Sequence, residues 1–160
     1  MIAVIGCGNA NRSDDGAGPR VIGLLRARRS IHRDVRLLDA GTDGMAVMFA
    51  ARGCQTLIVA DACQSGSPPG AVFELPGAEA EQRYTPALNL HDFRWDHALY
   101  AGRKMFRDAF PADVTVMLVE AETVDFGVEL SPSVSAAVEI MADKIERMIR
   151  SRLAAAPPTA

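Results

Sequence analysis

The sequence predicts an α/β fold: a single domain of three layers, with a mostly parallel central sheet of about five strands and helices on both faces. Two observations predict it. The chain has 160 residues, which is enough for one well-buried core and short for two domains. Short apolar runs, typical of strands buried on both faces, alternate along it with longer segments of helical periodicity. We expect residues 1–153 to form this domain and residues 154–160 to form a flexible C-terminal tail.

The elements of the first half follow from apolar runs and from the turn residues between them. MIAVI at 1–5 and TLIVA at 56–60 are uninterrupted apolar runs, so each predicts a buried strand. In chain order we expect a strand at 1–5, a polar loop at 6–16, a helix at 17–29, a strand at 35–38 ending at Asp39, a turn at 39–44, a helix at 45–51 and a strand at 56–60 ending at Asp61.

The second half is less regular. Ser131 followed by Pro132 is typical of a helix N-cap with proline at the first helical position. Trp95, Leu99 and Phe106 are spaced to share one helical face. We expect a strand at 71–75 with Glu74 facing outward, a loop at 76–90, a helix at 93–110, a strand at 114–119 and a long helix from 132 onward.

Composition and charge exclude several classes of function. With 17 Lys and Arg against 20 Asp and Glu, the formal net charge is -3, unlike that of a typical nucleic-acid binder. The cysteines, Cys7, Cys54 and Cys63, form no CxxC pair, so we expect free thiols in a reducing compartment. The first residues lack the pattern of a signal peptide or a membrane span. We therefore expect a soluble cytoplasmic protein.

Acidic residues follow three of the predicted strands. The first strand leads to Asp14 and Asp15, the second ends at Asp39 and the third ends at Asp61. His91 lies in the loop ahead of the 93–110 helix. In open parallel sheets, ligands bind beyond the carboxyl ends of the strands, where such loops converge. Carboxylates with one imidazole suit a hard or borderline cation, so this edge is the candidate site.

Most of these residues also have a structural interpretation. Asp14 or Asp15 can cap the positive end of the following helix. Asp61 can bond to amides of a neighbouring loop. His97 follows His91 by six residues, which puts the two about 240° apart on a helix, whereas paired helical ligands share one face. We therefore expect His97 to be a packed or hydrogen-bonded helical side chain.

The Gly6-Cys7-Gly8 turn has two further interpretations. A dinucleotide-binding fingerprint needs a third glycine where Asn11 stands, and the two aspartates that follow would repel a pyrophosphate. Nucleotide binding is therefore disfavoured. Cys7 has no clearly assigned base, so we expect a small buried residue rather than a nucleophile.

Five short motifs stand in order over nearly the whole chain. They are Gly6-x-Gly8-Asn9-(x4)-Asp14-Asp15-Gly16-x-Gly18, then Asp39-Ala40-Gly41-Thr42-x-Gly44, then Ile58-Val59-Ala60-Asp61-Ala62, then His91, and finally Leu130-Ser131-Pro132-Ser133-Val134. Each motif is weak by itself. Taken together in this order, they resemble the hydrogenase maturation protease family.

The resemblance implies an endopeptidase on a compact domain with a mostly parallel sheet. Such an enzyme removes a C-terminal extension from the precursor of a [NiFe]-hydrogenase large subunit after nickel insertion. By motif position, the resemblance makes Asp15, Asp61 and His91 the metal-binding and catalytic residues. Because the family's first-loop ligand is often glutamate, the choice between Asp14 and Asp15 stays open.

The resemblance also implies how the site would act. We expect the nickel to arrive with the precursor, and we expect no nucleotide cofactor. Asp15 or Asp61 is the candidate base for an activated water. Asp39, Gly41 and Thr42 are candidate substrate-binding residues, because their turn lies on the same edge; the alternative is a plain strand-to-helix turn.

Two other functions remain open at the level of the sequence. One is a metallopeptidase that carries its own zinc, and the other is a non-catalytic nucleotide-binding or metallochaperone module. For the favoured function the expected partner is the large-subunit precursor, which a monomer meets transiently.

Overall fold

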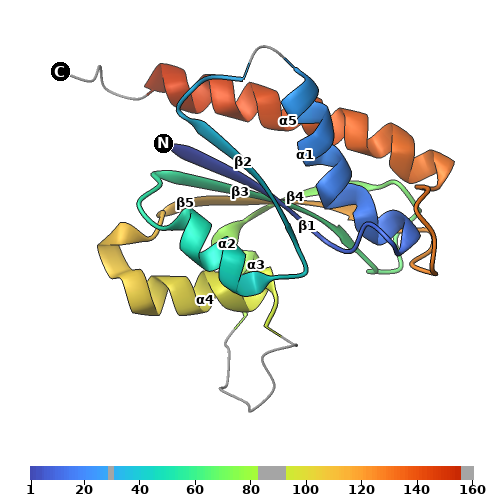
Figure 1. The fold of residues 1–160 in the computed structure, drawn as a ribbon, viewed down its shortest axis with the longest axis horizontal. Helices are drawn as coiled ribbons and strands as arrows, with labels where there is room; N and C mark the ends of the chain where they lie inside the picture. Colours follow the sequence, from blue (N-terminus) through green and yellow to red (C-terminus); the bar gives the residue numbers. More distant parts are fainter. Residues whose placement is uncertain (29–30, 83–92, 156–160) are drawn as a thin grey trace.

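The structure is a computed structural model that describes residues 1–28, 31–82 and 93–155, and its centre is a five-stranded sheet (Figure 1). The strands lie in the order β2-β1-β3-β5-β4, and neighbouring strands are parallel except for the antiparallel pair β4 and β5. They are β1 (Ile2–Cys7), β2 (Val35–Gly41), β3 (Thr56–Cys63), β4 (Val72–Pro76) and β5 (Asp113–Glu120). The predicted α/β fold with a mostly parallel sheet is confirmed.

Helices cover both faces of the sheet, which gives the three predicted layers (Figure 1). One face carries α1 (Ala17–Ala27) and α5 (Pro132–Ala155), and the other carries α2 (Gly44–Ala51) and α4 (Trp95–Phe106). The remaining elements are the short helix α3 (Gly77–Ala80) and two 3-10 turns, η1 (Ser13–Gly16) and η3 (Arg107–Ala109).

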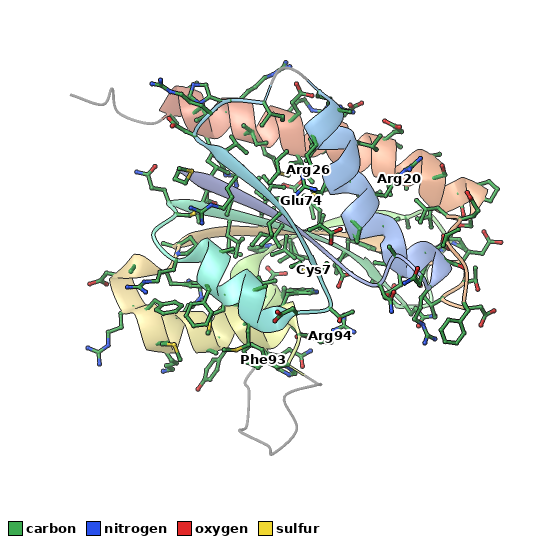
Figure 2. All side chains as sticks on the ribbon, viewed as in Figure 1. Cys7, Arg20, Arg26, Glu74, Phe93 and Arg94 are labelled. Atoms are coloured by element: carbon green, nitrogen blue, oxygen red, sulfur yellow. The ribbon has the colours of Figure 1, made fainter. Side chains whose placement is uncertain are left out.

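Alternate side chains of the central strands pack into two separate cores (Figure 2). In β1, Ile2 and Val4 belong to the core under α1 and α5, whereas Ala3 and Ile5 belong to the core under α2 and α4. Because both faces of the strand are buried, every position must be apolar. This is why the strand appears in the sequence as an uninterrupted apolar run.

The third strand is longer than predicted, which changes the position of its acid. Strand β3 continues to Cys63, so Asp61 lies within the strand instead of following it. The extension is held by pairing with β5, where Asp61 stands opposite Leu118. A polar residue near the end of a strand can stay in the sheet when its backbone forms hydrogen bonds to the neighbouring strand. The pattern of apolar residues in the sequence does not reveal such pairing.

Three other segments differ from their predicted form. The strand predicted at 35–38 continues to Gly41 as β2, because its pairing with β1 goes on as far as Cys7 opposite Gly41. Residues 76–90 are predicted as a loop, but α3 forms at 77–80, where Gly77 sits against the side chain of Val114. The helix predicted at 93–110 is shorter, because α4 ends at Phe106 and Arg107 then takes a positive φ of 47°.

The C-terminal helix begins as predicted. Pro132 is its first residue, and the Ser131 hydroxyl accepts the Val134 amide at 3.4 Å as an N-cap. The helix continues to Ala155, so the first residues of the predicted 154–160 tail are helical, and 156–160 lie outside the described residues. Among the helices of the described ranges, none combines the length and apolar character needed to cross a membrane.

Candidate active site

A pocket lies at the carboxyl edge of strands β1, β2 and β3. Gly6 of β1 pairs with Asp39 on one side and Ala60 on the other, so the residues that follow reach this edge together. The pocket has a volume of about 200 Å³ and is lined by Cys7, Gly8, Asp15, Gly41, Thr42, Asp43, Gly44, Val47, Asp61, Arg94 and Trp95. It therefore brings together two of the three predicted metal ligands, Asp15 and Asp61.

Two glycines allow the walls of this pocket to approach so closely. A Cβ on Gly8, which has a φ of +118°, would lie 1.9 Å from the Asp15 carbonyl oxygen. A Cβ on Gly44, at the start of α2, would lie 2.3 Å from the Phe93 carbonyl oxygen. Gly8 thus has a packing role in the wall of the pocket.

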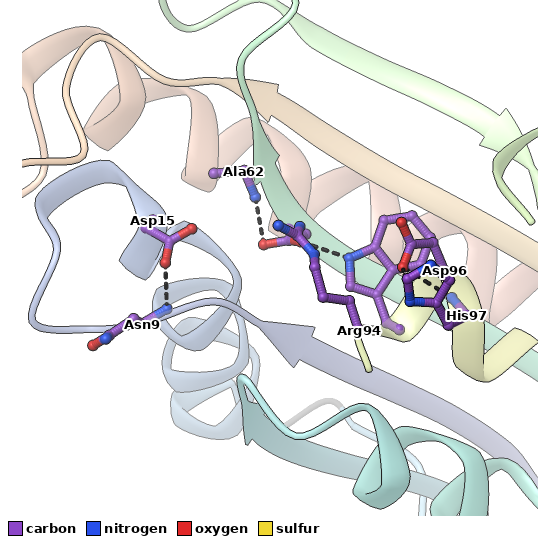
Figure 3. A network of polar contacts seen from close by, with 8 residues as sticks. Asn9, Asp15, Ala62, Arg94, Asp96 and His97 are labelled. Atoms are coloured by element: carbon purple, nitrogen blue, oxygen red, sulfur yellow. Dashed lines mark hydrogen bonds and ion pairs between the residues drawn. The ribbon is translucent and has the colours of Figure 1, made fainter. Parts of the chain in front are cut away.

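Asp61 is almost fully buried, with 3% of its side chain exposed. Its Oδ2 accepts the indole N–H of Trp95 at 2.6 Å and the Arg94 guanidinium at 3.3 Å. Its Oδ1 accepts the Ala62 amide at 2.8 Å (Figure 3). Neighbouring backbone, the partner considered for Asp61 from the sequence, supplies only one of these bonds.

Burial raises the pKa of Asp61 to about 6, because desolvation disfavours the charged carboxylate. The bonds from Trp95 and Ala62 and the charge of Arg94 oppose this rise, whereas the negative charge of Asp15 adds to it. The negative charge of Asp15, which lines the same pocket, thus also disfavours the ionised form of Asp61. A cation between them would relieve both the repulsion and the cost of burying Asp61.

Asp15 is the residue of the first loop that faces this pocket. It accepts one hydrogen bond, from the Asn9 amide at 2.8 Å, and its side chain is partly exposed. In Figure 3, Asn9 and Asp15 lie on one side of the site and Arg94, Asp96 and His97 lie on the other.

Asp14 faces the opposite way and is fully buried. Its two oxygens accept the amides of Glu122, Thr123 and Ser131 at 2.7–3.1 Å, and the Ser131 hydroxyl at 2.9 Å. This network joins the first loop to the chain after β5 and to the start of α5. Neither Asp14 nor Asp15 forms a cap hydrogen bond at the start of α1, where the N-cap is Gly16, so that interpretation is not supported.

The turn after β2 forms one wall of the pocket. Gly41 and Thr42 line the pocket, whereas Asp39 does not. Asp39 Oδ1 accepts the Gly41 amide at 3.0 Å, and the Gly41 carbonyl accepts the Gly8 amide at 2.8 Å. Asp39 and Gly41 are the last part of strand β2, so the turn predicted at 39–44 is limited to Thr42 and Asp43 before α2 begins. Thr42 is the member of this predicted set best placed to offer a side chain to a substrate.

His91 lies outside the described residues, so its role as a ligand stays a prediction. His97 lies in α4, with 23% of its side chain exposed, and its ring centroid is 6.2 Å from that of Phe93. Its Nδ1 is 3.8 Å from Asp96 Oδ1, so the predicted packed helical histidine is confirmed.

Within the described part of the chain, no three His, Cys, Asp or Glu side chains form a group that could hold a metal.

Cys7 lies in the pocket wall but is not poised as a nucleophile. It is buried, and this burial, together with the negative charge of Asp61, raises the pKa of its thiol well above the ordinary value. The expected small buried cysteine is confirmed.

Arg94 and Trp95 also line the pocket, although the sequence does not predict them as site residues. The sequence predicts Trp95 on the apolar face of a helix, and it is buried in the core, but its indole N–H donates to Asp61. A buried tryptophan usually needs an acceptor for its N–H, and that requirement was the available signal. Nothing in the local pattern pointed to Arg94.

A second pocket, of about 370 Å³, adjoins the first and shares Asp15, Arg94 and Trp95 with it. One of its walls includes Cys63, at the end of β3. The loop that follows is held by Glu120, whose carboxylate accepts the Ser65 amide and hydroxyl, the Gly66 amide and the Cys63 thiol. These bonds lower the pKa of Glu120 to about 2. The two pockets form adjacent hollows on either side of Asp15, Arg94 and Trp95.

Comparison with known proteins adds an independent line of argument. The model of a family described as hydrogenase maturation protease matches residues 19–148. The hydrogenase 2 maturation protease of Escherichia coli (strain K12) is 29% identical over 150 residues, which cover 93% of this chain and 90% of that protein. The hydrogenase expression/formation protein HoxM of Azotobacter vinelandii is 29% identical over 157 residues, covering 89% of this chain and 73% of HoxM.

Solved structures give the same result. The hydrogenase maturating endopeptidase HybD from E. coli is similar with a TM-score of 0.80 and 28% identity, covering 95% of this chain and 93% of HybD. The [NiFe] hydrogenase maturation protease HycI from Thermococcus kodakarensis, at 18% identity, shares the fold with a TM-score of 0.74, covering 94% of this chain and 92% of HycI.

Proposed function

This chain belongs to the hydrogenase maturation protease family and is a peptidase, and from this premise we propose that it removes the C-terminal extension of a [NiFe]-hydrogenase large-subunit precursor. The cut follows nickel insertion. Asp15, Asp61 and His91 recognise the nickel that the precursor already holds, so the metal belongs to the substrate and is not a resident cofactor of the enzyme.

The observation that carries this proposal is the meeting of Asp15 and Asp61 in one pocket. They come from the first loop and from β3, and both keep room to bind a cation. Each carboxylate oxygen can accept about two hydrogen bonds. Asp61 Oδ1 accepts only the Ala62 amide among the described residues, and Asp15 accepts only the Asn9 amide.

The donor set suits the proposed substrate. Two carboxylates and one imidazole are acceptable ligands for Ni²⁺ and fill only part of its coordination sphere. The remaining positions can be filled by the precursor's own ligands. Cleavage would then be coupled to nickel insertion, because a metal-free precursor offers nothing for Asp15 and Asp61 to bind.

The cleavage step uses the same groups. Water adds its oxygen to the scissile carbonyl carbon, the C–N bond breaks, and the departing amine takes up a proton. Asp15 or Asp61 accepts the proton that the water loses. The wall formed by Thr42 and the adjoining second pocket flank these carboxylates and offer space to the extended peptide on either side.

The test is to incubate the protein with a nickel-loaded large-subunit precursor and to detect the released C-terminal peptide by its mass. We expect Asp15→Asn, Asp61→Asn and His91→Ala to lose release by at least about a hundredfold. Asp34→Asn is the matched control, since Asp34 stands at the far end of the sheet, where its carbonyl accepts the Ile2 amide.

Two results would contradict the proposal. One is cleavage of the precursor by Asp61→Asn at the wild-type rate. The other is equal cleavage of nickel-loaded and nickel-free precursor by the unaltered protein, because recognition of nickel would then play no part.

A further inference from the structure

We propose that Arg94 is a competing counterion which lowers the affinity of the site for free divalent cations, so that nickel is accepted only when a docked precursor presents it. The inference rests on the proposed role of Asp15 and Asp61 in binding nickel. It assigns a specificity-determining function to a residue that lies beside those ligands and touches one of them.

Arg94 is in direct contact with Asp61. The guanidinium Nη2 lies 3.3 Å from Asp61 Oδ2, which also accepts the Trp95 indole at 2.6 Å. With two donors, Oδ2 has no acceptor capacity left. A cation must therefore displace Arg94 from Oδ2, or bind at Oδ1 beside a positive charge that already partly neutralises the carboxylate.

The charged side chains around Arg94 are acidic. Arg94 is the one Lys or Arg side chain that lines either pocket in the described ranges, whereas Asp15, Asp43, Asp61 and Asp96 all line one or both. Without Arg94, all charged side chains lining the two pockets would be acidic, and the site would bind any divalent cation. Arg94 supplies the opposing charge at the buried carboxylate.

Arg94 combines a fixed backbone with an exposed side chain. Its backbone is held at the start of α4, where its carbonyl accepts the Ala98 amide at 3.0 Å, and a Cβ on Gly44 would lie 2.7 Å from that carbonyl oxygen. Its side chain is 61% exposed, against 3% for Asp61. The guanidinium can therefore leave Asp61 while the helix start stays in place.

The second pocket can accommodate the Arg94 side chain when it leaves Asp61. Arg94 and Asp96, which Figure 3 shows on the same side of the site, both line its volume of about 370 Å³. A substrate that docks against this edge brings contacts which offset the loss of the Arg94–Asp61 pair. A free metal ion brings none, so the same pair discriminates between the two sources of nickel.

The experiment measures binding of Ni²⁺ alone, supplied as a simple salt, by isothermal titration calorimetry at pH 8. We expect Arg94→Leu to bind Ni²⁺ at least about tenfold more tightly than the unaltered protein, because one positive charge is removed from the site. Arg94→Lys keeps a charge and should gain less. Arg20→Ala removes an exposed arginine from α1, away from this edge, and should leave the affinity unchanged (Figure 2).

A second readout uses the cleavage assay. Free Ni²⁺ should inhibit Arg94→Leu at concentrations about tenfold lower than those needed for the unaltered protein, because it then competes with the precursor's nickel for Asp15 and Asp61.

The outcomes separate this inference from the proposed function. If Arg94→Leu binds Ni²⁺ no more tightly than the unaltered protein, or shows no binding at all, the inference is overturned whatever the cleavage assay shows. If binding tightens, Asp61→Asn in the Arg94→Leu background should abolish the gain, and retention of the gain would also overturn it. Failure of the proposed function appears elsewhere, as wild-type cleavage by Asp61→Asn.

Discussion

Asp14 and Asp15 are neighbours in the chain and lie in opposite environments. Asp14 is fully buried and accepts four hydrogen bonds from the segment between β5 and α5. Asp15 is partly exposed, accepts one bond and lines a pocket with a second acid, Asp61. The hydrogen-bond acceptor capacity of Asp14 is used by other parts of the protein, whereas Asp15 can still accept a ligand.

The same contrast separates Glu120 from Asp61. Both are buried acids near the carboxyl ends of adjacent strands. The bonds from the loop at 63–66 lower the pKa of Glu120 to about 2, whereas burial raises that of Asp61 to about 6. The difference teaches that burial alone does not mark a functional acid. The distinguishing property is whether the protein itself supplies enough donors to the carboxylate.

Among substitutions of these acidic residues, we expect the largest change in stability at Asp14. Asp14→Asn replaces one carboxylate oxygen by an amide that faces backbone N–H donors, so we expect a loss of roughly 3–5 kcal/mol in the free energy of unfolding. Urea denaturation measures this loss. Glu129→Gln, at an exposed position of the same segment, is the control and should change little. A loss below about 1 kcal/mol would show that the four bonds do not hold the loop.

Asp61 should show the opposite sign. Its pKa of about 6, against 3.8 for a free carboxyl, means that ionising it in the folded protein costs about 3 kcal/mol. Asp61→Asn should therefore raise the free energy of unfolding by up to that amount at pH 8. The gain should shrink as the pH falls below 6 and vanish near pH 3, where the carboxyl is largely protonated in both the folded and the unfolded state. Equal effects at pH 4 and pH 8 would contradict the assigned cause.

A smaller effect is expected at Glu120, because its donors lie in a surface loop. Since its pKa is lowered from 4.5 to about 2, its ionised form stabilises the fold above about pH 4.5, and this stability is lost as the pH falls toward 2. Glu120→Gln should lower the stability at pH 7 and reduce the loss between pH 4.5 and pH 2. Acid unfolding of the two proteins, followed by circular dichroism, compares the two slopes. Parallel slopes would rule out this role of Glu120.

The fold was largely predictable because burial on both faces forces each central strand to be apolar throughout. The end of β3 was not, since Asp61 interrupts the apolar run while pairing with β5 continues past it. A helix as short as α3 leaves no periodicity to detect, so the prediction of a loop failed at 77–80.

The site was predictable in outline, because parallel strands bring their carboxyl ends to one edge. The orientation of Asp14 and Asp15 was not. Successive residues of a 3-10 turn differ by about 120°, but only the packing of the chain after β5 decides which one turns inward. Arg94 and Trp95 reach Asp61 from more than thirty residues away in the sequence, and no local pattern encodes such a contact.

We expect the smallest change in stability at Asp15. The central claim is that this residue serves the reaction rather than the fold. Asp15→Asn loses at most part of one bond to the Asn9 amide, so its free energy of unfolding should stay within about 0.5 kcal/mol of the wild-type value. The most direct measurement is the rate at which this folded variant releases the C-terminal peptide from nickel-loaded precursor, detected by mass. The account predicts a loss of at least about a hundredfold without loss of fold. Release at the wild-type rate would contradict it.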